Sequence, residues 1–369
     1  MKTSHGDCES ECTQNKQMVS DACHKKPQKL LVSALEPSSN LHLKALYPYL
    51  EEAELCGIFD ESLGTPLYSP KAFSVMGIKD VLAKIFSAKE AMAELVFLAR
   101  DVDRVLLIDA PAFNLPLAKK IKEKYPDKEI SYYVLPKVWA WKRKRAEKVN
   151  RYCDKLLSIF PFEKKFYPRS TYVGNPLMDE IKTFKNEVTN NGKIAFLAGS
   201  RKSEVRSLMP VYHELSAKHK EELILVIPPH FSDEEIQELY GDISKFTVIK
   251  ETHKALLEAD FAYVCSGTAT LECSLIGTPM VLVFRANKLE YWIGRKFVKL
   301  SHVGLANIIF DFEGKDEMHA ELLQDEVNAE RMYKIYKEMD REKFLKRSIE
   351  LREELGKSRL KDVAEIILN

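Results

Sequence analysis

Short apolar runs alternate with longer amphipathic segments through most of the chain. The runs have the length and the β-branched and aromatic content of buried strands, and most segments between them have helical spacing. The predicted strands are residues 30–35, 105–108, 130–134, 155–159, 172–173, 194–197, 223–227, 246–249, 261–264 and 280–284. This alternation predicts an α/β protein in which helices cover both faces of parallel sheets.

The strands divide better into two sheets than one. Residues 184–193 are polar and turn-rich, and a new strand follows them, so we place a domain boundary there. We expect an unstructured leader at 1–28, Rossmann-like domains at 29–187 and 188–340, and C-terminal helices at 341–369. Because doubly wound sheets bind ligands at the carboxyl ends of their strands, two such sheets facing each other predict a central cleft.

Composition narrows the possible partners. The chain has 56 basic and 55 acidic residues and a net charge of +1, so attraction to an anionic ligand has to be local. No segment has the layout of a nucleic-acid module, and we expect no nucleic-acid partner. The seven cysteines form no recognisable disulfide framework or zinc module, which favours reduced cytosolic thiols. No apolar run approaches the ~20 residues that span a bilayer.

A strand-to-helix turn early in the second domain has the residues of a phosphate site. After the strand at 194–197, Gly199 permits a tight turn and Ser200 can cap the next helix. Arg201 can then bind a phosphate through two nitrogens, beside the free amides of the helix start. Many ordinary turns share these residues, so a simple capped helix stays open as the alternative.

A second turn of this type follows the strand at 261–264. Its backbone amides and hydroxyls suit a diphosphate. The residues are Ser266, Gly267, Thr268 and Thr270. Glu272, near the helix start, can accept two hydrogen bonds from a ribose diol. The alternative is a glutamate that only favours the helix dipole, but two such turns in one domain favour a nucleotide diphosphate.

One carboxylate in the first domain is placed for acid–base chemistry. Asp109 directly follows the strand at 105–108, so we expect it in the cleft, where it can accept a proton from a sugar hydroxyl. The alternative is an aspartate that caps a turn. Asp101 and Asp103 resemble a metal-binding acid pair, but they precede the same strand and so lie at its other end. No other cluster of hard oxygen ligands stands out, and we expect no metal.

Two segments have the composition of membrane-surface contacts. Apolar residues from Phe73 to Phe86 follow helical spacing with lysines around them, which fits a helix in a bilayer interface. A helix that faces the core is the alternative. Trp139 and a second tryptophan precede a basic run that ends at Arg145. This run suits anionic headgroups, or is a solvated helix face.

The order of several short motifs resembles the bacterial lipid-A-disaccharide synthase family over nearly the whole chain after residue 28. Each motif is unspecific alone, whereas their common order is highly specific. The motifs are LVSALE at 31–36, SVMGI at 74–78, IDAPAFN at 108–114, YVLPKVWAW at 133–141, FPFE at 160–163, VGNPL at 173–177, LAGSR at 197–201, SGTATLE at 266–272, YW at 291–292, LAN at 305–307 and ELLQ at 321–324.

The resemblance implies a glycosyltransferase-B (GT-B) fold in which the C-terminal helices at 341–369 pack back on the first domain. It implies a metal-independent, inverting hexosyltransferase with no cofactor. The implied reaction transfers 2,3-diacylglucosamine from UDP-2,3-diacylglucosamine to the 6-hydroxyl of 2,3-diacylglucosamine 1-phosphate (lipid X). The products are UDP and a beta-1,6 disaccharide of lipopolysaccharide biosynthesis. The implied location is cytoplasmic, peripheral on the inner face of the bacterial inner membrane.

The resemblance also assigns residue roles. The family's catalytic aspartate falls on Asp109, and Glu36 matches an acidic position in the first loop. The nucleotide contacts of the family fall on Arg201, Glu272, Asn307 and Gln324. The chain departs from the family where Ser39 and Asn40 replace a Gly-Asp pair and Ala112 replaces a second acid.

Two alternatives stay open. One is another GT-B enzyme, such as a UDP-N-acetylglucosamine 2-epimerase or a transferase with a soluble acceptor, which would share the nucleotide turns. The other is a UDP-sugar-binding regulator that has lost catalysis, which the departures at Ser39, Asn40 and Ala112 keep open.

Overall fold

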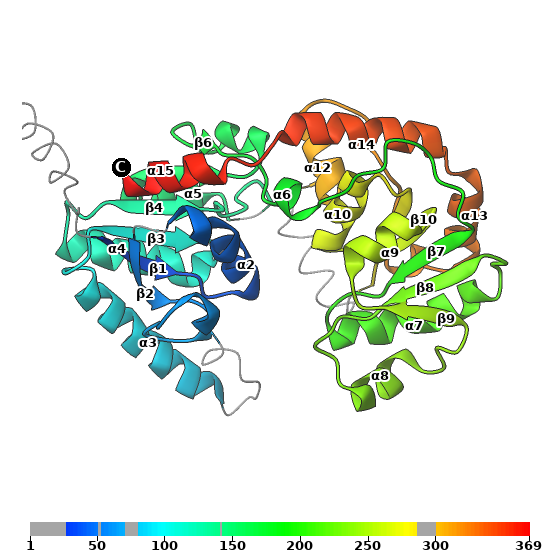
Figure 1. Cartoon of the computed structure of the whole chain (residues 1–369), viewed down its shortest axis with the longest axis horizontal. Coiled ribbons are helices and arrows are strands. Elements are labelled where there is room, and N and C mark those ends of the chain that lie inside the picture. The colour runs from blue at the N-terminus through cyan, green and yellow to red at the C-terminus, as the bar shows by residue number, and fades with distance from the viewer. Residues whose placement is uncertain (1–26, 51–52, 71–79, 141, 286–299) are drawn as a thin grey trace, which may run out of the picture.

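The computed structural model describes residues 27–50, 53–70, 80–140, 142–285 and 300–369, with the backbone alone in 80–88. It consists of two lobes, each built on a six-stranded parallel sheet, which are joined along one side (Figure 1). Every predicted strand forms, and the α/β prediction is confirmed. No helix among the described residues is both long enough and apolar enough to cross a membrane.

The first sheet has the strand order β2-β1-β3-β4-β5-β6. Its strands are β1 (Gln28–Ser33), β2 (Ala53–Ile58), β3 (Arg104–Ile108), β4 (Ile130–Tyr133), β5 (Lys155–Ser158) and β6 (Thr171–Tyr172). Alternate side chains point to opposite faces, as strand geometry requires. Leu30 and Val32 pack in one cluster with α2 (Pro37–Leu46), and Leu31 packs on the other side with α3 (Asp80–Leu98), α4 (Pro111–Lys124) and α5 (Lys144–Tyr152).

Short helical turns complete this lobe. They are η1 (Tyr47–Tyr49), η2 (Glu61–Leu63) and η4 (Pro161–Lys165). The turn η1 continues α2, and η4 follows β5 at the side of the lobe that meets the second lobe.

The second sheet has the order β12-β11-β10-β7-β8-β9. Its strands are β7 (Lys193–Leu197), β8 (Glu222–Val226), β9 (Phe246–Ile249), β10 (Phe261–Cys265), β11 (Met280–Phe284) and β12 (Glu321–Leu323). One face carries α9 (Thr252–Glu258), α10 (Thr268–Ile276) and α12 (Leu305–Phe312). The other face carries α7 (Lys202–Ser216), α8 (Asp233–Tyr240) and α13 (Ala329–Glu338), and η5 (Gln324–Glu326) follows β12.

Two strands were not predicted from the sequence. β2 mixes polar and apolar residues in AELCGI, and only its last two residues are buried, because it is the edge strand beside β1. β12 is three residues long and is also an edge strand. Edge strands need less apolar surface, and hydrophobic periodicity therefore misses them.

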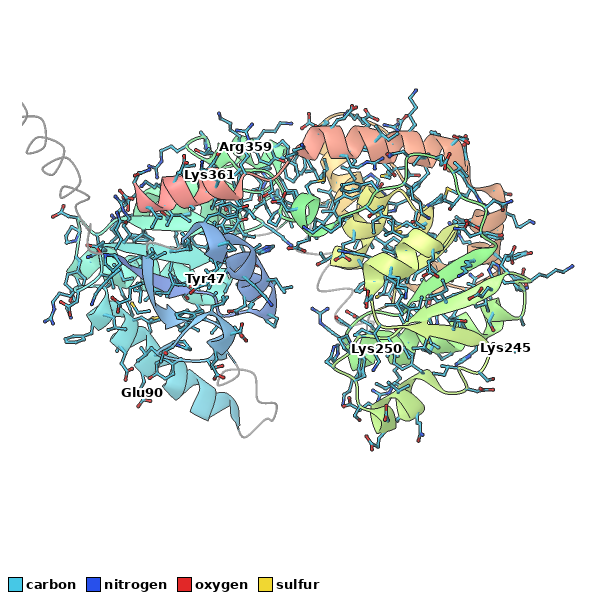
Figure 2. The ribbon with its side chains drawn as sticks, viewed as in Figure 1. Tyr47, Glu90, Lys245, Lys250, Arg359 and Lys361 are labelled. Atoms are coloured by element: carbon cyan, nitrogen blue, oxygen red, sulfur yellow. The ribbon has the colours of Figure 1, made fainter. Side chains whose placement is uncertain are left out.

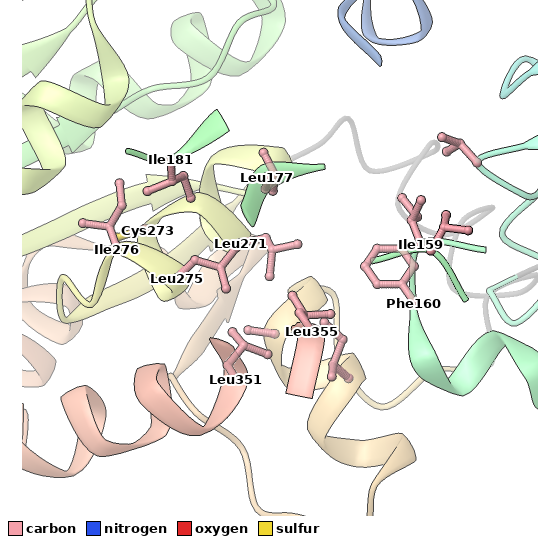
Figure 3. Packing of buried hydrophobic residues seen from close by; sticks show 14 of the residues in the cluster. Ile159, Phe160, Leu177, Ile181, Leu271, Cys273, Leu275, Ile276, Leu351 and Leu355 are labelled. Carbon is pink, nitrogen blue, oxygen red and sulfur yellow. The ribbon is translucent and has the colours of Figure 1, made fainter. Parts of the chain in front are cut away.

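The C-terminal helices divide between the lobes. Leu351 and Leu355 of α14 (Arg341–Leu355) lie beside Leu271 and Leu275 of α10 in the second lobe (Figure 3). Only α15 (Leu360–Leu368) returns to the first lobe, where it contacts α2, β3 and β5. The expected return of all residues from 341 to 369 is therefore limited to the last helix.

The chain crosses between the lobes twice at nearly the same place. The first crossing runs from β6 through α6 (Leu177–Glu180), and the second joins α14 to α15 (Figure 1). The two crossings touch, because the Arg359 amide donates to the Val173 carbonyl at 3.0 Å and the Tyr172 hydroxyl donates to the Leu355 carbonyl. Figure 2 places Arg359 and Lys361 at the start of α15 beside these crossings.

Aromatic side chains form a second contact between the lobes. Phe312, at the end of α12, stacks on Phe162 with 4.3 Å between ring centroids. Lys165 donates to the Phe312 carbonyl at 2.6 Å. Trp139 is 5% exposed, packs edge-on against Phe162, and donates its indole N–H to Glu163 at 3.2 Å. The expectation that Trp139 contacts a membrane is wrong, because its ring belongs to this buried cluster.

Candidate functional site

Three charged residues meet at the carboxyl edge of the first sheet. Glu36 follows β1, Asp109 follows β3, and Lys137 follows β4. These strands are consecutive neighbours in the sheet, so their carboxyl ends lie side by side. The structure therefore brings the predicted pair Glu36 and Asp109 together and adds Lys137, which the sequence analysis did not single out.

Asp109 sits in a turn held in an unusual conformation. Asp109 and Ala110 both have left-handed backbones, with φ of 47° and 43°. The buried Asn114 side chain donates to the Asp109 carbonyl at 2.8 Å and accepts from the Ser33 hydroxyl at 2.7 Å. The Tyr132 hydroxyl donates to the same carbonyl. Left-handed non-glycine residues of this kind need such support and occur often at functional sites.

The environment shifts the acidity of both carboxyls. Burial raises the pKa of Asp109, while Lys137 and the Ala110 amide lower it in part. Burial also raises the pKa of Glu36, the Asp109 carboxylate raises it further, and Lys137 lowers it. A carboxylate with a raised proton affinity is better suited to remove a proton near neutral pH.

Replacing Lys137 with methionine should move the acidic limb of the kcat/KM–pH profile to higher pH. The Lys137 ammonium lowers the pKa of both carboxyls, so its loss raises both pKa values further and leaves less of each carboxyl ionised at mildly acidic pH. The profile can be measured by initial rates across pH. Lys137→Arg keeps the positive charge and should leave the limb in place; an unmoved limb in Lys137→Met would contradict this electrostatic role.

The residues that depart from the family pattern are structural here. Ser39 is buried, and its hydroxyl donates to the Ile108 carbonyl at 3.1 Å, which ties α2 to the end of β3. The side-chain nitrogen of Asn40 donates to the Ala34 carbonyl at 2.7 Å, and its side-chain oxygen accepts from the backbone amide of Asp60 at 2.8 Å. Ala112 is exposed in the first turn of α4. Asp109 and Glu36 therefore keep their places without the missing acids.

The turn after β7 differs from the expected phosphate site. Gly199 has φ of 98°, and the Glu204 carboxylate lies against it. Glu204 accepts from the amides of Ser200 and Arg201 at 3.1 and 3.2 Å. These amides are therefore already occupied, and the expectation that they meet a phosphate is wrong for this arrangement. Glu204 was not predicted, although a glutamate at the third helical position signals such a cap.

Arg201 itself remains accessible. Its side chain is 78% exposed and forms a 2.7 Å ion pair with Glu204 through Nη1. Its other guanidinium nitrogens have no partner within the described residues. Since Val264 pairs with Leu197, the turns after β7 and β10 are neighbours, and Arg201 can serve a ligand at the second turn.

The turn after β10 is the more open of the two. Gly267 caps α10 without a side-chain hydrogen bond, and Gly267 and Thr268 are exposed. The Ser266 amide donates to the Val283 carbonyl at 3.0 Å, and the hydroxyl of the buried Thr270 donates to the Gly267 carbonyl at 2.8 Å. Thr270 therefore supports the turn, while the amides at Thr268 and Ala269 have no acceptor within the described residues.

Glu272 lies one turn into α10 and has a partner that the sequence did not reveal. His253 Nε2 lies 3.3 Å from a Glu272 carboxylate oxygen. A hydrogen bond to Glu272 raises the pKa of His253. Burial raises the pKa of Glu180 in α6, and the Glu272 carboxylate raises it further. Glu272 therefore lies beside the first crossing between the lobes.

Two further residues that the resemblance assigned to nucleotide binding have other contacts in the structure. Asn307 is fully buried; its amide donates to His319 and Glu321, and its oxygen accepts from the amides of Met318 and His319. Asn307 thus holds α12 to β12 and has no exposed surface for a ligand, contrary to expectation. Gln324 has φ of 54°, and its carbonyl accepts from Arg285, a cation that was not predicted.

The remaining candidates are spread over the first lobe. Residues 73–79 lie outside the described part of the chain, as does the second tryptophan of the basic segment. Lys142, Arg143 and Lys144 are exposed at the start of α5. Asp101 pairs with Arg100, and Asp103 accepts from the Lys29 amide at the amino end of the sheet. Within the described ranges, no group of His, Cys, Asp and Glu residues could hold a metal ion.

Solved structures with this architecture share little sequence with the chain. MurG from Acinetobacter baumannii has a TM-score of 0.56 at 15% identity, covering 93% of this chain and 99% of that one. The calicheamicin glycosyltransferase gives 0.60 at 11% identity, covering 93% and 98%. The UDP-GlcNAc 2-epimerase from Neisseria meningitidis, solved with UDP-GlcNAc, gives 0.53 at 10% identity, covering 92% and 98%. At such identities they bear on the fold alone, and the GT-B prediction is confirmed.

Sequence relatives are much closer. The model of the lipid-A-disaccharide synthetase family matches residues 30–368. Lipid-A-disaccharide synthase from Campylobacter jejuni (strain RM1221) is 47% identical over 359 residues, which covers 91% of this chain and 98% of the relative. The enzyme of the same name from Helicobacter pylori (strain G27) is 43% identical over 350 residues, covering 91% and 96%. The chain belongs to the lipid-A-disaccharide synthetase family.

Proposed function

We propose that the chain transfers 2,3-diacylglucosamine from its UDP donor to the 6-hydroxyl of lipid X, with release of UDP. The observation that carries this proposal is the 43–47% identity to lipid-A-disaccharide synthases over 91% of the chain. The first lobe (29–187) would receive the acceptor, and the second (188–340) would receive UDP. The paired carboxyls of one lobe and the open helix start of the other support this division.

Asp109 is the general base in this proposal. Its carboxylate accepts the proton of the acceptor 6-hydroxyl while that oxygen attacks the anomeric carbon of the donor, and the bond to UDP breaks with inversion. The raised pKa of Asp109 supports the role, because a carboxylate with a higher proton affinity is a stronger base. Lys137 lowers the pKa of Asp109 in part, and the Asp109 carboxylate in turn raises the pKa of Glu36.

The UDP diphosphate would lie at the start of α10. The free amides at Thr268 and Ala269 and the positive end of the helix dipole favour negative charge there. Arg201 reaches from the neighbouring turn and would stabilise the charge that grows on the leaving group, and Glu272 would accept from the ribose diol. Ser266 and Gly267 shape this turn, and Gln324 lies on the same edge of the sheet.

One assay tests the function. Purified protein would be given UDP-2,3-diacylglucosamine and lipid X in neutral detergent micelles with a strong chelator present. We expect UDP and a disaccharide in equal amounts. Release of UDP without disaccharide, or production of an epimerised sugar nucleotide, would instead indicate one of the other GT-B activities. Recovery of activity only after a divalent ion is added would exclude the metal-independent mechanism.

We also propose that the first lobe rests on the cytoplasmic face of the inner membrane. Helices α3 and α5 follow β2 and β4, so both begin at the carboxyl edge of the sheet, and both lie on the same face. The apolar residues between Phe73 and Phe86 precede α3 in the sequence or belong to its first two turns, and exposed basic residues begin α5. Apolar and basic groups at one edge suit an anionic bilayer surface.

Replacing Ile85 and Phe86 with serine should release the protein from anionic liposomes. Loss of two apolar side chains from a bilayer interface weakens binding by several kcal/mol, on the order of 2 kcal/mol for each. Co-sedimentation with vesicles measures the bound fraction. Phe97→Ser is the matched control, because Phe97 is a 53% exposed phenylalanine at the other end of α3. Equal release by both variants, or none by either, would contradict this membrane contact.

A further inference from the structure

A cavity of about 700 Å³ opens beside Glu36 in the first lobe. One wall is a single face of α2 and its N-cap, and the opposite wall comes from the segment after β2. The lining residues are Leu35, Glu36, Pro37, Asn40, Leu41, Lys44, Asp60, Ser62, Leu63 and Pro70. The cavity is thus continuous with the catalytic edge, and it has apolar walls and few charges.

Two of the three charged residues of this cavity lie along α2, and the third, Asp60, lies on the opposite wall. Glu36 caps the helix at one end, and Lys44 lies on the same face two turns later. At ~1.5 Å rise per residue, the two positions are about 12 Å apart along the helix axis. The flexible side chain of Lys44 shortens that span to about the distance between the 6-hydroxyl and the 1-phosphate of a hexosamine phosphate.

Lys44 has the properties of a cation that is available to bind an anionic ligand. It is exposed, and no ion pair or hydrogen bond joins it to another described residue. The other charge, Asp60 on the far wall, accepts from the Ser62 amide at 3.0 Å and caps the short turn η2. Leu41 is 60% exposed on the cavity wall, which leaves apolar surface beside the ammonium.

We propose that this cavity is the acceptor subsite and that Lys44 binds the phosphate of the acceptor. The inference rests on the proposed function, because it assigns an orientation to that acceptor. With the phosphate on Lys44, the sugar lies over Pro37 and Asn40 and its 6-hydroxyl reaches Glu36 and Asp109. The apolar walls around Leu41 and Leu63 face its acyl chains. Lys44 is a specificity-determining residue that does not touch the reacting atoms.

The test compares two acceptors, lipid X and 2,3-diacylglucosamine without its phosphate, in wild-type protein and Lys44→Met. Because the micelles consist of neutral detergent, no anionic lipid headgroup is present that could bind Lys44 in place of the acceptor phosphate. A charge-assisted hydrogen bond contributes enough that wild type should favour lipid X in kcat/KM by about tenfold or more. In Lys44→Met that preference should vanish through a higher KM for lipid X, with the unphosphorylated acceptor unaffected.

Three controls define the outcome. Lys44→Arg keeps the charge and should retain most of the preference. Lys120→Met removes an exposed lysine of α4 on the opposite face of the sheet and should change nothing. UDP affinity, measured by calorimetry, should be equal in all variants. A preference for lipid X that survives in Lys44→Met, or a loss that is equal for both acceptors, would overturn the proposal.

Binding separates this inference from the proposed reaction. The equilibrium affinity of the protein for each of the two micellar acceptors can be measured without turnover. If wild type forms no disaccharide but binds lipid X more tightly than the unphosphorylated acceptor, and Lys44→Met loses that difference, the function fails while the phosphate site stands. If turnover is normal and the difference in affinity persists in Lys44→Met, the site fails while the function stands.

Discussion

Replacing Asp109 with asparagine should lower kcat by about 10²-fold or more, because the amide cannot accept the proton of the acceptor hydroxyl. The change is nearly isosteric, and asparagine tolerates the left-handed backbone that Asp109 adopts at φ of 47°. The backbone hydrogen bonds from Asn114 and Tyr132 to the carbonyl of residue 109 are unaffected by the side chain. Turnover of UDP-2,3-diacylglucosamine and lipid X at saturation gives the measurement.

The control for this variant is Asp101→Asn, which removes an exposed carboxylate that lies ahead of the same strand and pairs with Arg100. It should leave kcat near that of the wild type. Both variants should unfold at about the wild-type temperature and bind UDP normally, because the proposed nucleotide site lies in the other lobe. Near-normal turnover in Asp109→Asn would remove this residue from the mechanism.

Replacing Gly174 with alanine should produce the largest loss of stability of the changes considered. Gly174 has φ of 82°, and an added Cβ would lie 2.5 Å from the Lys357 carbonyl oxygen and 2.6 Å from Ser358 Cα. These are backbone atoms of the second crossing, so they cannot rotate away. The left-handed conformation costs about 1–2 kcal/mol and the clash adds to it, for a total on the order of 3 kcal/mol.

Thermal unfolding would measure that loss, and hydrogen exchange in α15 would show where it arises. Gly192→Ala is the matched control, since Gly192 also has a positive φ, of 68°, but an added Cβ there meets no atom within 4 Å. Gly192→Ala should lose only the part of the stability that the left-handed backbone conformation costs a residue with a side chain. Equal destabilisation in the two variants would mean that the crossing yields to the methyl group and that the clash is unimportant.

Most of the fold follows from local patterns that are visible in the sequence. Strands such as Arg104–Ile108 and Phe261–Cys265 are buried on both faces, and their continuous apolar runs identify them. The edge strand Ala53–Ile58 lacks that signature, because its neighbours on one side are not strands. The division of the C-terminal helices depends on which buried face each one meets, and their own sequences do not specify this.

The candidate site was predictable only where a residue's role follows from its position at a strand end. Asp109 and Glu36 meet because β1 and β3 are neighbours, and parallel strands place their carboxyl ends at one edge. The status of Asn307 and of the Ser200 amide depends on long-range or competing hydrogen bonds to Glu321 and Glu204. The Glu204 cap is local and could have been predicted from its spacing, whereas the partner of Asn307 is set by tertiary packing, which motif spacing does not reveal.

The paired crossings between the lobes limit how they can move. Two chain segments, at Val173–Gly174 and Lys357–Arg359, are bonded side by side at one margin of the molecule. Two bodies that are joined along one margin can open and close by rotating about it, whereas the bonded segments oppose sliding of one lobe past the other. A rotation of this kind would bring the lobe proposed to bind the sugar nucleotide and the lobe proposed to bind its acceptor toward each other along an arc.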